Sequence, residues 1–216
     1  MWHAETGRSE PVSYAIANGA TTVPLHLEPW GTVFIVFRKP AAAPSRTVTK
    51  IVETPLATID GPWQLSFQPN RGAPASITLD TLASWTNNAD PGVKYFSGIG
   101  TYTKTIDAPA EWFKPGVSLW LDLGDVENLA EVSVNGTSLG VIWHAPYRVD
   151  VTKALKRGKN ELTIKVINTW VNRLIGDQQT NASKVAFTDV TPYSAGSPLM
   201  PSGLIGPVQV LRGSTK

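Results

Sequence analysis

Residues 119–143 read LWLDLGDVENLAEVSVNGTSLGVIW, and no other stretch of the chain carries so strong a signal for local structure. Apolar residues recur at every second position in two segments, as they do in half-buried β-strands: Leu119, Leu121 and Leu123, then Ala130, Val132 and Val134. Asn135-Gly136 follows, and these two residues tolerate the positive φ angles of a type I′ turn. The stretch therefore predicts a β-hairpin, and the alternation resumes at Leu162 and runs toward Trp170.

The composition favours an all-β protein. The chain has 216 residues, of which 42% are hydrophobic and 17% charged, as is ordinary for a folded protein. Eight Trp, 18 Gly and 17 Pro occur among many short strand patterns, with almost no long helix pattern. The net charge of +2 is too balanced to indicate a nucleic acid or an anionic membrane as partner. The sequence has no cysteine and no apolar run near the ~20 residues of a membrane helix.

The strand patterns divide the chain into two unequal parts. Three short strands are predicted near the N-terminus, at residues 12–16, 23–27 and 32–37. A segment of this size has no second layer to cover its apolar face, so it must pack on something else. Residues 40–44 enclose three alanines between prolines and predict a linker, which we extend over 41–54. The remaining residues, 55–213, hold the strand patterns of a larger domain.

No group of residues has the pattern of a catalytic site. The densest acidic group is Asp122, Asp125, Glu127 and Glu131. Asp125 and Glu127 fall in the turn between two strands, where solvated carboxylates are expected. Residues 136–140 match the G-x-S-x-G nucleophile pattern, yet they lead into a strand rather than a helix. The three histidines are far apart in the sequence, so we predict neither catalytic nor metal-binding residues.

The chemistry that remains is sugar binding. An aromatic face stacks on a pyranose while amide, carboxylate and guanidinium groups hydrogen-bond its hydroxyls. Two sets have this mixture: Trp170, Asn172, Arg173, Asp177, Gln178 and Gln179 form the first, and Tyr193 to Ser197 form the second. Both lie on or next to residues 172–202, a stretch of roughly 30 residues with little periodicity, and such long loops are usually functional or disordered.

The same aromatic and polar residues also have structural interpretations. Trp170 would then end a core strand, and Asp177 would cap a helix or pair with Arg173. Three other tryptophans interrupt or join apolar strand patterns and are predicted to lie in the core: Trp63, Trp112 and Trp120.

Several motifs, taken in chain order, resemble a known family. They are Gly61-Pro62-Trp63, residues 95–102 with Ser97-Gly98-Ile99-Gly100, residues 132–136 with Gly140 behind them, residues 147–152, residues 158–162 and residues 202–208. Together they resemble the sugar-binding jelly-roll domain of family 2 glycoside hydrolases. Residues 168–177 and 201–204 look most like the version near the C-terminus of large bacterial α-L-rhamnosidases of glycoside hydrolase family 106. The resemblance covers residues 55–213.

The resemblance implies an all-β architecture, with a galactose-binding-like jelly-roll β-sandwich over residues 55–213 beside a catalytic (β/α) barrel. It also implies that residues 1–40, with their three strands, are the remnant of a preceding β-sandwich. Ser97 would lie at the same end of the sandwich as Tyr193 and Ser197. A barrel carrying the acid and base carboxylates would need roughly 200 residues or more and has no counterpart in this chain.

We therefore expect a non-catalytic carbohydrate-binding accessory module of an α-L-rhamnosidase-like glycoside hydrolase, secreted or periplasmic. Its expected partners are a rhamnose- or galactose-containing glycan and the catalytic domain of the parent enzyme. The alternative is a structural interdomain module that docks on the barrel and binds no sugar. No cofactor is expected, although jelly rolls of this type often hold a structural calcium, for which the sequence has no carboxylate-rich series.

Overall fold

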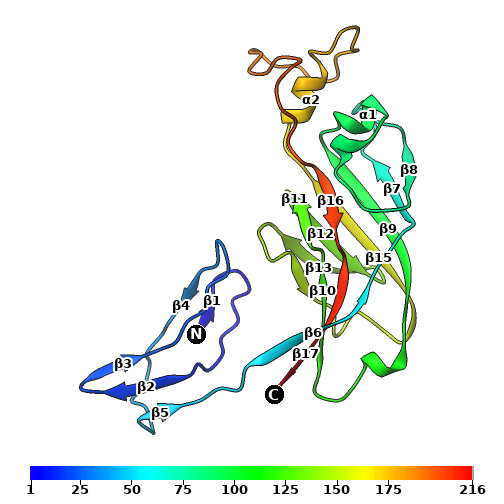
Figure 1. Cartoon of the computed structure of the whole chain (residues 1–216). Helices are drawn as coiled ribbons and strands as arrows, with labels where there is room; N and C mark the ends of the chain where they lie inside the picture. Colours follow the sequence, from blue (N-terminus) through cyan, green and yellow to red (C-terminus); the bar gives the residue numbers. More distant parts are fainter. Residues whose placement is uncertain (216) are drawn as a thin grey trace. The chain divides into compact units, whose positions relative to one another are not determined.

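The structure, a computed structural model, describes residues 1–215, and the chain divides into two units (Figure 1). The first is Met1–Val52 with the C-terminal residues from Ser214, and the second is Glu53–Gly213. The elements in chain order are β1 (Trp2–His3), β2 (Tyr14–Ala17), β3 (Ala20–Thr22), β4 (Val33–Phe34), β5 (Ser45–Arg46), β6 (Ile51–Thr58), β7 (Trp63–Phe67), β8 (Ser76–Leu79), η1 (Trp85–Asn87), α1 (Pro91–Lys94), β9 (Ile99–Ala108), η2 (Ala110–Trp112), β10 (Ser118–Asp122), β11 (Asp125–Glu127), β12 (Leu129–Val134), β13 (Thr137–Ile142), β14 (Arg148–Asp150), β15 (Gly158–Ile167), α2 (Val171–Gly176), β16 (Gly203–Gly206) and β17 (Gln209–Thr215). Strands dominate and the helices are short, so the predicted all-β class is confirmed.

The second unit is a β-sandwich of two main sheets. One sheet has six strands in the order β13-β12-β15-β9-β7-β8, and the other has four in the order β14-β10-β17-β6. A separate short pair joins β11 to β16. The two long strands β15 and β9 pair along their whole length, from Gly158 opposite Ala108 to Ile167 opposite Ile99. Two strands that lie far apart in the sequence thus pair at the centre of the six-stranded sheet.

The hairpin predicted from residues 119–143 is present. Strands β12 and β13 are joined by Asn135 and Gly136, whose φ angles are 52° and 77°, as a type I′ turn requires. The Asn135 side chain also donates to Asn160 Oδ1 (2.8 Å) and to the carbonyl of Ala154 (2.9 Å). These bonds attach the turn to the connection that leads into β15. The turn signal therefore fixes both the hairpin and its junction with the next strand.

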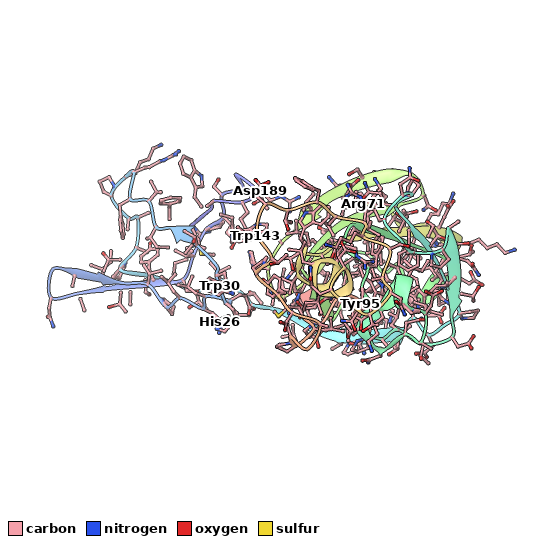
Figure 2. All side chains as sticks on the ribbon, turned by 90° about the horizontal axis from the view of Figure 1, so that it is seen from above. His26, Trp30, Arg71, Tyr95, Trp143 and Asp189 are labelled. Atoms are coloured by element: carbon pink, nitrogen blue, oxygen red, sulfur yellow. The ribbon has the colours of Figure 1, made fainter. Side chains whose placement is uncertain are left out.

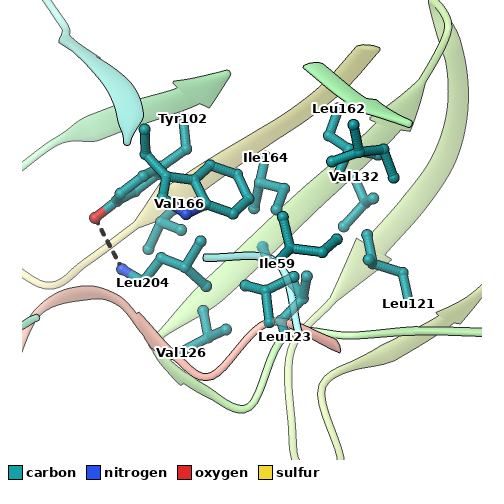
Figure 3. Close-up of a cluster of buried hydrophobic side chains, with 14 of the residues drawn as sticks. Ile59, Tyr102, Leu121, Leu123, Val126, Val132, Leu162, Ile164, Val166 and Leu204 are labelled. Atoms are coloured by element: carbon teal, nitrogen blue, oxygen red, sulfur yellow. Dashed lines mark hydrogen bonds between the residues drawn. The ribbon is translucent and has the colours of Figure 1, made fainter. Parts of the chain in front are cut away.

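The core lies between the two sheets, and a buried polar chain crosses it. Trp85 Nε1 donates to the Tyr102 hydroxyl (2.6 Å), which also accepts from the Leu204 backbone N–H (3.0 Å; Figure 3). Burial raises the pKa of Tyr102, so its hydroxyl stays neutral. Around this chain, Figure 3 shows apolar side chains from both sheets, among them Leu121 and Ile164. The elements η1 and β16, which are remote in sequence, are thereby hydrogen-bonded to β9 in the six-stranded sheet.

The tryptophans predicted for the core are not all buried. Trp63 and Trp112 are buried, as predicted. Trp120 is half-buried instead, because in β10 it alternates with the inward-facing Leu119 and Leu121. Its Nε1 donates to Ser118 Oγ (3.1 Å).

The first unit contains the expected three-stranded sheet, but its members differ from the prediction. The sheet has the order β3-β2-β5, with a turn at Asn18-Gly19. Strand β3 ends at Thr22 because Pro24, which has no N–H to donate, follows closely. The predicted third strand shortens to β4 and pairs with β1 in a separate sheet. Its place is taken by β5, which lies in the predicted linker 41–54, where β6 also begins.

Every residue of 1–52 is half-buried or exposed. Large apolar side chains stand in solvent, among them Trp30 (81% exposed) and Phe37 (70%). This unit therefore lacks a closed core within its described residues, as expected for a small strand segment without a second layer. Whether it is the remnant of a preceding sandwich stays a prediction. No helix within residues 1–215 is long and apolar enough to cross a membrane.

Candidate functional site

A cleft of about 490 Å³ lies where α1, α2 and the chain after α2 meet. Its lining residues are Gly72, Pro91, Gly92, Tyr95, Arg173, Gly176, Gln179, Thr180, Asn181, Ala182, Ser183 and Val185. Helices α1 and α2 lie at the same end of the sandwich (Figure 1). The view from above onto this end shows Arg71 and Tyr95 next to α2 (Figure 2). The cleft thus gathers residues from three segments that are distant in the sequence.

Hydrogen bonds to the body of the sandwich hold α2 in place. The Ser97 hydroxyl accepts from the Arg173 backbone N–H (3.1 Å). The Asn172 side chain donates to the Met200 carbonyl (2.7 Å) and accepts from the Met200 N–H (2.8 Å). Because Ser97, Asn172 and Arg173 are buried, these bonds form in a medium where losing one is costly. A helix of six residues, too short to be stable alone, is thereby fixed at the cleft.

An ion pair joins Arg173, which lines the cleft, to Asp177, which does not. Arg173 Nε lies 3.0 Å from Asp177 Oδ1, and both side chains are almost fully buried, at 6% and 4% exposure. The Asp177 carboxylate also accepts from the backbone N–H groups of Val185 (3.1 Å) and Ala186 (2.8 Å). Asp177 therefore balances the arginine and holds the loop after α2. The predicted pairing of Asp177 with Arg173 is confirmed.

Two glycines make room for the Arg173 guanidinium. A Cβ atom at Gly72 would lie 3.1 Å from Nη1, and φ at this residue is +85°. A Cβ atom at Gly176 would collide with Nη2 and would lie 2.5 Å from Cβ of Tyr95. Any other residue at these two positions would therefore displace the guanidinium or the Tyr95 ring.

Trp170 lies just before α2 and is 48% exposed. The interpretation that it ends a core strand is wrong, because β15 ends at Ile167. The Arg71 guanidinium sits over its ring, 4.9 Å from the centroid, and Gly72 next to Arg71 lines the cleft. Trp170 is therefore a neighbour of the cleft and not part of its lining.

The remaining predicted residues divide into two groups. Gln179 lines the cleft, and its Nε2 donates to the carbonyls of Ile175 (3.2 Å) and Ala195 (3.0 Å). Gln178 is half-buried beside it. Tyr193 and Ser197 are half-buried in the following loop, where Ser197 Oγ accepts from the Ser194 N–H (3.0 Å). Residues 193–197 contact the cleft region through the bond from Gln179 to Ala195, but none of these five residues lines the cleft.

Because they are buried, several residues predicted to bind sugar have a structural role instead. Ser97, Asn172 and Asp177 use their hydrogen-bonding groups within the protein, so in this structure they shape the cleft rather than face it. Residues 172–202 were expected to be a loop throughout, but α2 covers the first of them. Sugar binding by any of these residues stays a prediction.

Sequence reasoning missed most of the cleft lining. The sequence pattern does not predict Gly72, Tyr95, Asn181 or Val185 as lining residues, and Arg71 lies in a polar, Pro-rich stretch without a binding motif. The residue type at position 181 is one available signal, because asparagine often adopts a positive φ in tight turns. In the structure φ of Asn181 is 61°. The approach of Gly72 to Arg173 has no such local signal.

The fold gives a basic partner to two members of the acidic group of 122–131. Asp122 lies 3.7 Å from Arg148 and Glu131 lies 3.1 Å from Lys165, so each has a basic partner. Burial and then the charge of Asp125 raise the pKa of Glu127. Among residues 1–215 there is no group of three or more His, Cys, Asp or Glu that fits a metal ion, so we derive no role for calcium. Calcium binding stays a prediction.

A second cavity, of about 450 Å³, lies elsewhere in the same unit. It is lined by residues 58–61, Trp63, residues 80–82 and residues 205–208. None of the predicted site residues belongs to it.

Comparisons with known proteins agree with this fold. Residues 98–195 match the family described as glycosyl hydrolase 2 galactose-binding domain-like. Over these residues the chain is similar to a galactose-binding-like domain of the glycosyl hydrolase 2 type. The structure is also similar to a rhamnosidase from Novosphingobium sp. PP1Y, with a TM-score of 0.91 and 54% identity over 98% of this chain and 20% of that one.

Two further relatives are less similar to this chain. A protein of Formosa agariphila named "Putative beta-glucuronidase" is 33% identical over 188 residues, which are 76% of this chain and 16% of that protein. A β-glucuronidase from Ruminococcus gnavus, at a TM-score of 0.54 and 19% identity over 75% of this chain and 28% of its own, shows the fold alone. The chain therefore spans about a fifth or less of the first two relatives.

Proposed function

We propose that this chain acts as a non-catalytic carbohydrate-binding module of an α-L-rhamnosidase-like glycoside hydrolase. The observation that carries the proposal is the cleft between α1 and α2, which combines an aromatic ring, amides, hydroxyls and a guanidinium. These are the groups that recognise a sugar. The similarity to the Novosphingobium rhamnosidase supports a rhamnose-containing glycan, and the galactose-binding-like domain supports a galactose-containing one.

The absence of catalysis is part of the proposal. No Asp or Glu is among the residues that line the cleft, and Asp177, the carboxylate next to the lining residue Arg173, is paired with that arginine. Glycoside hydrolysis needs two carboxyls about 5–9.5 Å apart across a sugar. We further propose that the second partner is the catalytic domain of the parent enzyme, and that the protein is secreted or periplasmic, where it meets such glycans.

The test is titration calorimetry of the purified chain with rhamnose- and galactose-containing oligosaccharides. A shallow cleft should give affinities from millimolar to micromolar, about −4 to −8 kcal/mol. Asn181→Gly removes a lining side chain and keeps the positive φ, so it should weaken binding. Trp170→Ala should weaken binding about fivefold if the ring stacks on sugar, about 1 kcal/mol. Trp143→Ala is the matched control, because Trp143 is 53% exposed and lies outside the cleft. Absence of saturable binding to any of these glycans would overturn the proposal.

A second candidate function is docking on a catalytic domain without sugar binding. An apolar row on the outer face of the six-stranded sheet favours it. Leu129, Ile167 and Ile99 stand opposite one another on β12, β15 and β9, and Leu129 and Ile99 are 36% and 37% exposed. On the neighbouring strand β13, Val141 is 59% exposed. Exposed apolar rows of this kind mark protein interfaces. Concentration-dependent self-association that Leu129→Lys abolishes, together with no response to glycans, would favour this function.

A further inference from the structure

The guanidinium of Arg173 has two edges, and only one of them meets a protein partner. The Nε edge faces Asp177, and no acceptor within the described chain is aligned with the Nε–H. The other edge, Nη1 and Nη2, lies against Gly72 and Gly176, which line the cleft together with Arg173. Across residues 1–215, no side chain or carbonyl accepts a hydrogen bond from Nη1 or Nη2. The arginine therefore borders the cleft with donors that the protein leaves unused.

The charges around the cleft have a positive excess. The Arg71 guanidinium lies over Trp170 next to Gly72, and the Lys94 ammonium lies 5.6 Å from the centroid of the lining residue Tyr95. The acids nearby are already engaged, since Asp177 bonds two backbone N–H groups and Asp90 accepts from the Gly92 N–H (2.7 Å). Arg173, Arg71 and Lys94 carry three positive charges against the two negative charges of Asp177 and Asp90, so these groups together favour an anion over a neutral ligand by a net charge of +1.

We propose that the cleft selects saccharides that carry a carboxylate, with a uronic acid residue placed against the Nη1 and Nη2 edge of Arg173. The planar guanidinium presents two parallel N–H groups that match the two oxygens of a carboxylate. A neutral hydroxyl offers one acceptor and no charge, so it uses this edge less well. The inference rests on the proposed function, because it names the sugar class that the same cleft takes.

The test uses two ligands that differ in one group. Rhamnose linked to galacturonic acid and rhamnose linked to galactose are titrated into the full chain at low salt, so that only the carboxylate distinguishes them. We expect the acidic disaccharide to bind at least about tenfold more tightly, and the ratio to shrink at high salt because added ions screen the attraction. Equal affinities for the two disaccharides would overturn this inference and leave the proposed function standing. Failure of both to bind would overturn the proposed function as well.

Two variants locate the effect. Arg173→Lys keeps the positive charge opposite Asp177 but loses the paired donors, so the ratio should fall to about threefold or less. Trp143→Ala, at an exposed tryptophan outside the cleft, should leave both affinities and their ratio unchanged. If Arg173→Lys does not fold, Arg71→Gln, next to the lining residue Gly72, takes its place, and the ratio should fall by about half or more. An undiminished ratio in the folded variant would overturn the assignment to these guanidinium groups.

Discussion

The two ends of strand β15 carry polar clusters that differ in how far they are satisfied. At its start, Asn160 makes four side-chain hydrogen bonds: Oδ1 accepts from Asn135 Nδ2 (2.8 Å) and from the Lys156 N–H (2.9 Å), and Nδ2 donates to the carbonyls of Lys156 (2.6 Å) and Gly158 (2.7 Å). Beyond its end, Arg173 has a carboxylate on one edge, while its other edge has no acceptor among the described residues. Both residues are buried.

The difference separates a structural cluster from a candidate binding site. Buried polar groups are normally hydrogen-bonded, and the Asn160 cluster follows this rule completely. It joins the hairpin turn to the start of β15 and has no capacity left for a ligand. Arg173 departs from the rule beside a cleft, so its unused donors are available to something that enters the cleft. The predictions that follow test this difference by removing groups from each kind of cluster.

The largest loss of stability is expected from Asp177→Asn. It leaves the Arg173 charge buried without a counter-charge, which typically costs about 3–5 kcal/mol in the free energy of unfolding. The matched control is the double variant Arg173→Met with Asp177→Leu, which removes both charges and should cost less. Urea unfolding followed by tryptophan fluorescence measures both. A loss under about 1 kcal/mol for Asp177→Asn would show that the cleft wall is far wetter than its burial indicates.

Asn160→Ala should destabilise the protein by about 3 kcal/mol, because it leaves several buried groups without partners. Asn87→Ala, at an exposed asparagine, is the control and should stay within about 0.5 kcal/mol of the parent. The same unfolding assay applies. If Asn160→Ala lowers the free energy of unfolding as little as Asn87→Ala does, the hydrogen bonds of Asn160 do not stabilise the fold.

Tyr102→Phe tests the polar chain in the core. The change leaves the Trp85 indole N–H and the Leu204 N–H without an acceptor, and we expect a loss of about 2 kcal/mol. Tyr147→Phe is the control, since its half-buried hydroxyl makes one hydrogen bond, to the Asn128 carbonyl (3.1 Å), and should cost less. A larger loss for Tyr147→Phe than for Tyr102→Phe would reverse the assignment.

The smallest effect is expected at Glu127, and it depends on pH. Burial and Asp125 raise the pKa of Glu127 above its ordinary value of 4.5, so the folded state holds the proton more tightly than the unfolded state. Stability is then lost as the pH rises above this value. Glu127→Gln should therefore be more stable than the parent at neutral pH, by a few tenths of a kcal/mol because solvent screens the group, and equal to it near pH 3. Thermal unfolding at the two pH values measures this, and the opposite sign at neutral pH would contradict it.

The sequence predicted those features that depend on neighbouring residues. Period-two alternation and Asn135-Gly136 identify the hairpin because strand faces and turn angles are local properties. The pairing of Arg173 with Asp177, one of the structural alternatives, joins two residues only four apart in the chain. Helix α2 was not predicted, because six residues are too few for helical periodicity.

The cleft could not be predicted because it depends on packing between distant segments. Gly72 lies about a hundred residues before Arg173 in the chain, and only the folded sandwich brings it against the guanidinium. Burial likewise decides the role of Asn172, which composition alone suggested for a ligand. In the first unit, Pro24 ended a strand whose apolar alternation was otherwise convincing.

The central claim, that the cleft between α1 and α2 binds sugar, is tested most directly by an NMR titration. The isotope-labelled chain is titrated with a rhamnose- and galacturonate-containing oligosaccharide while its backbone amide resonances are recorded. We predict saturable shifts concentrated at Tyr95, at α2 and at residues 179–185, with the amides around Asn160 unmoved. Shifts centred elsewhere, or none at millimolar sugar, would contradict the account.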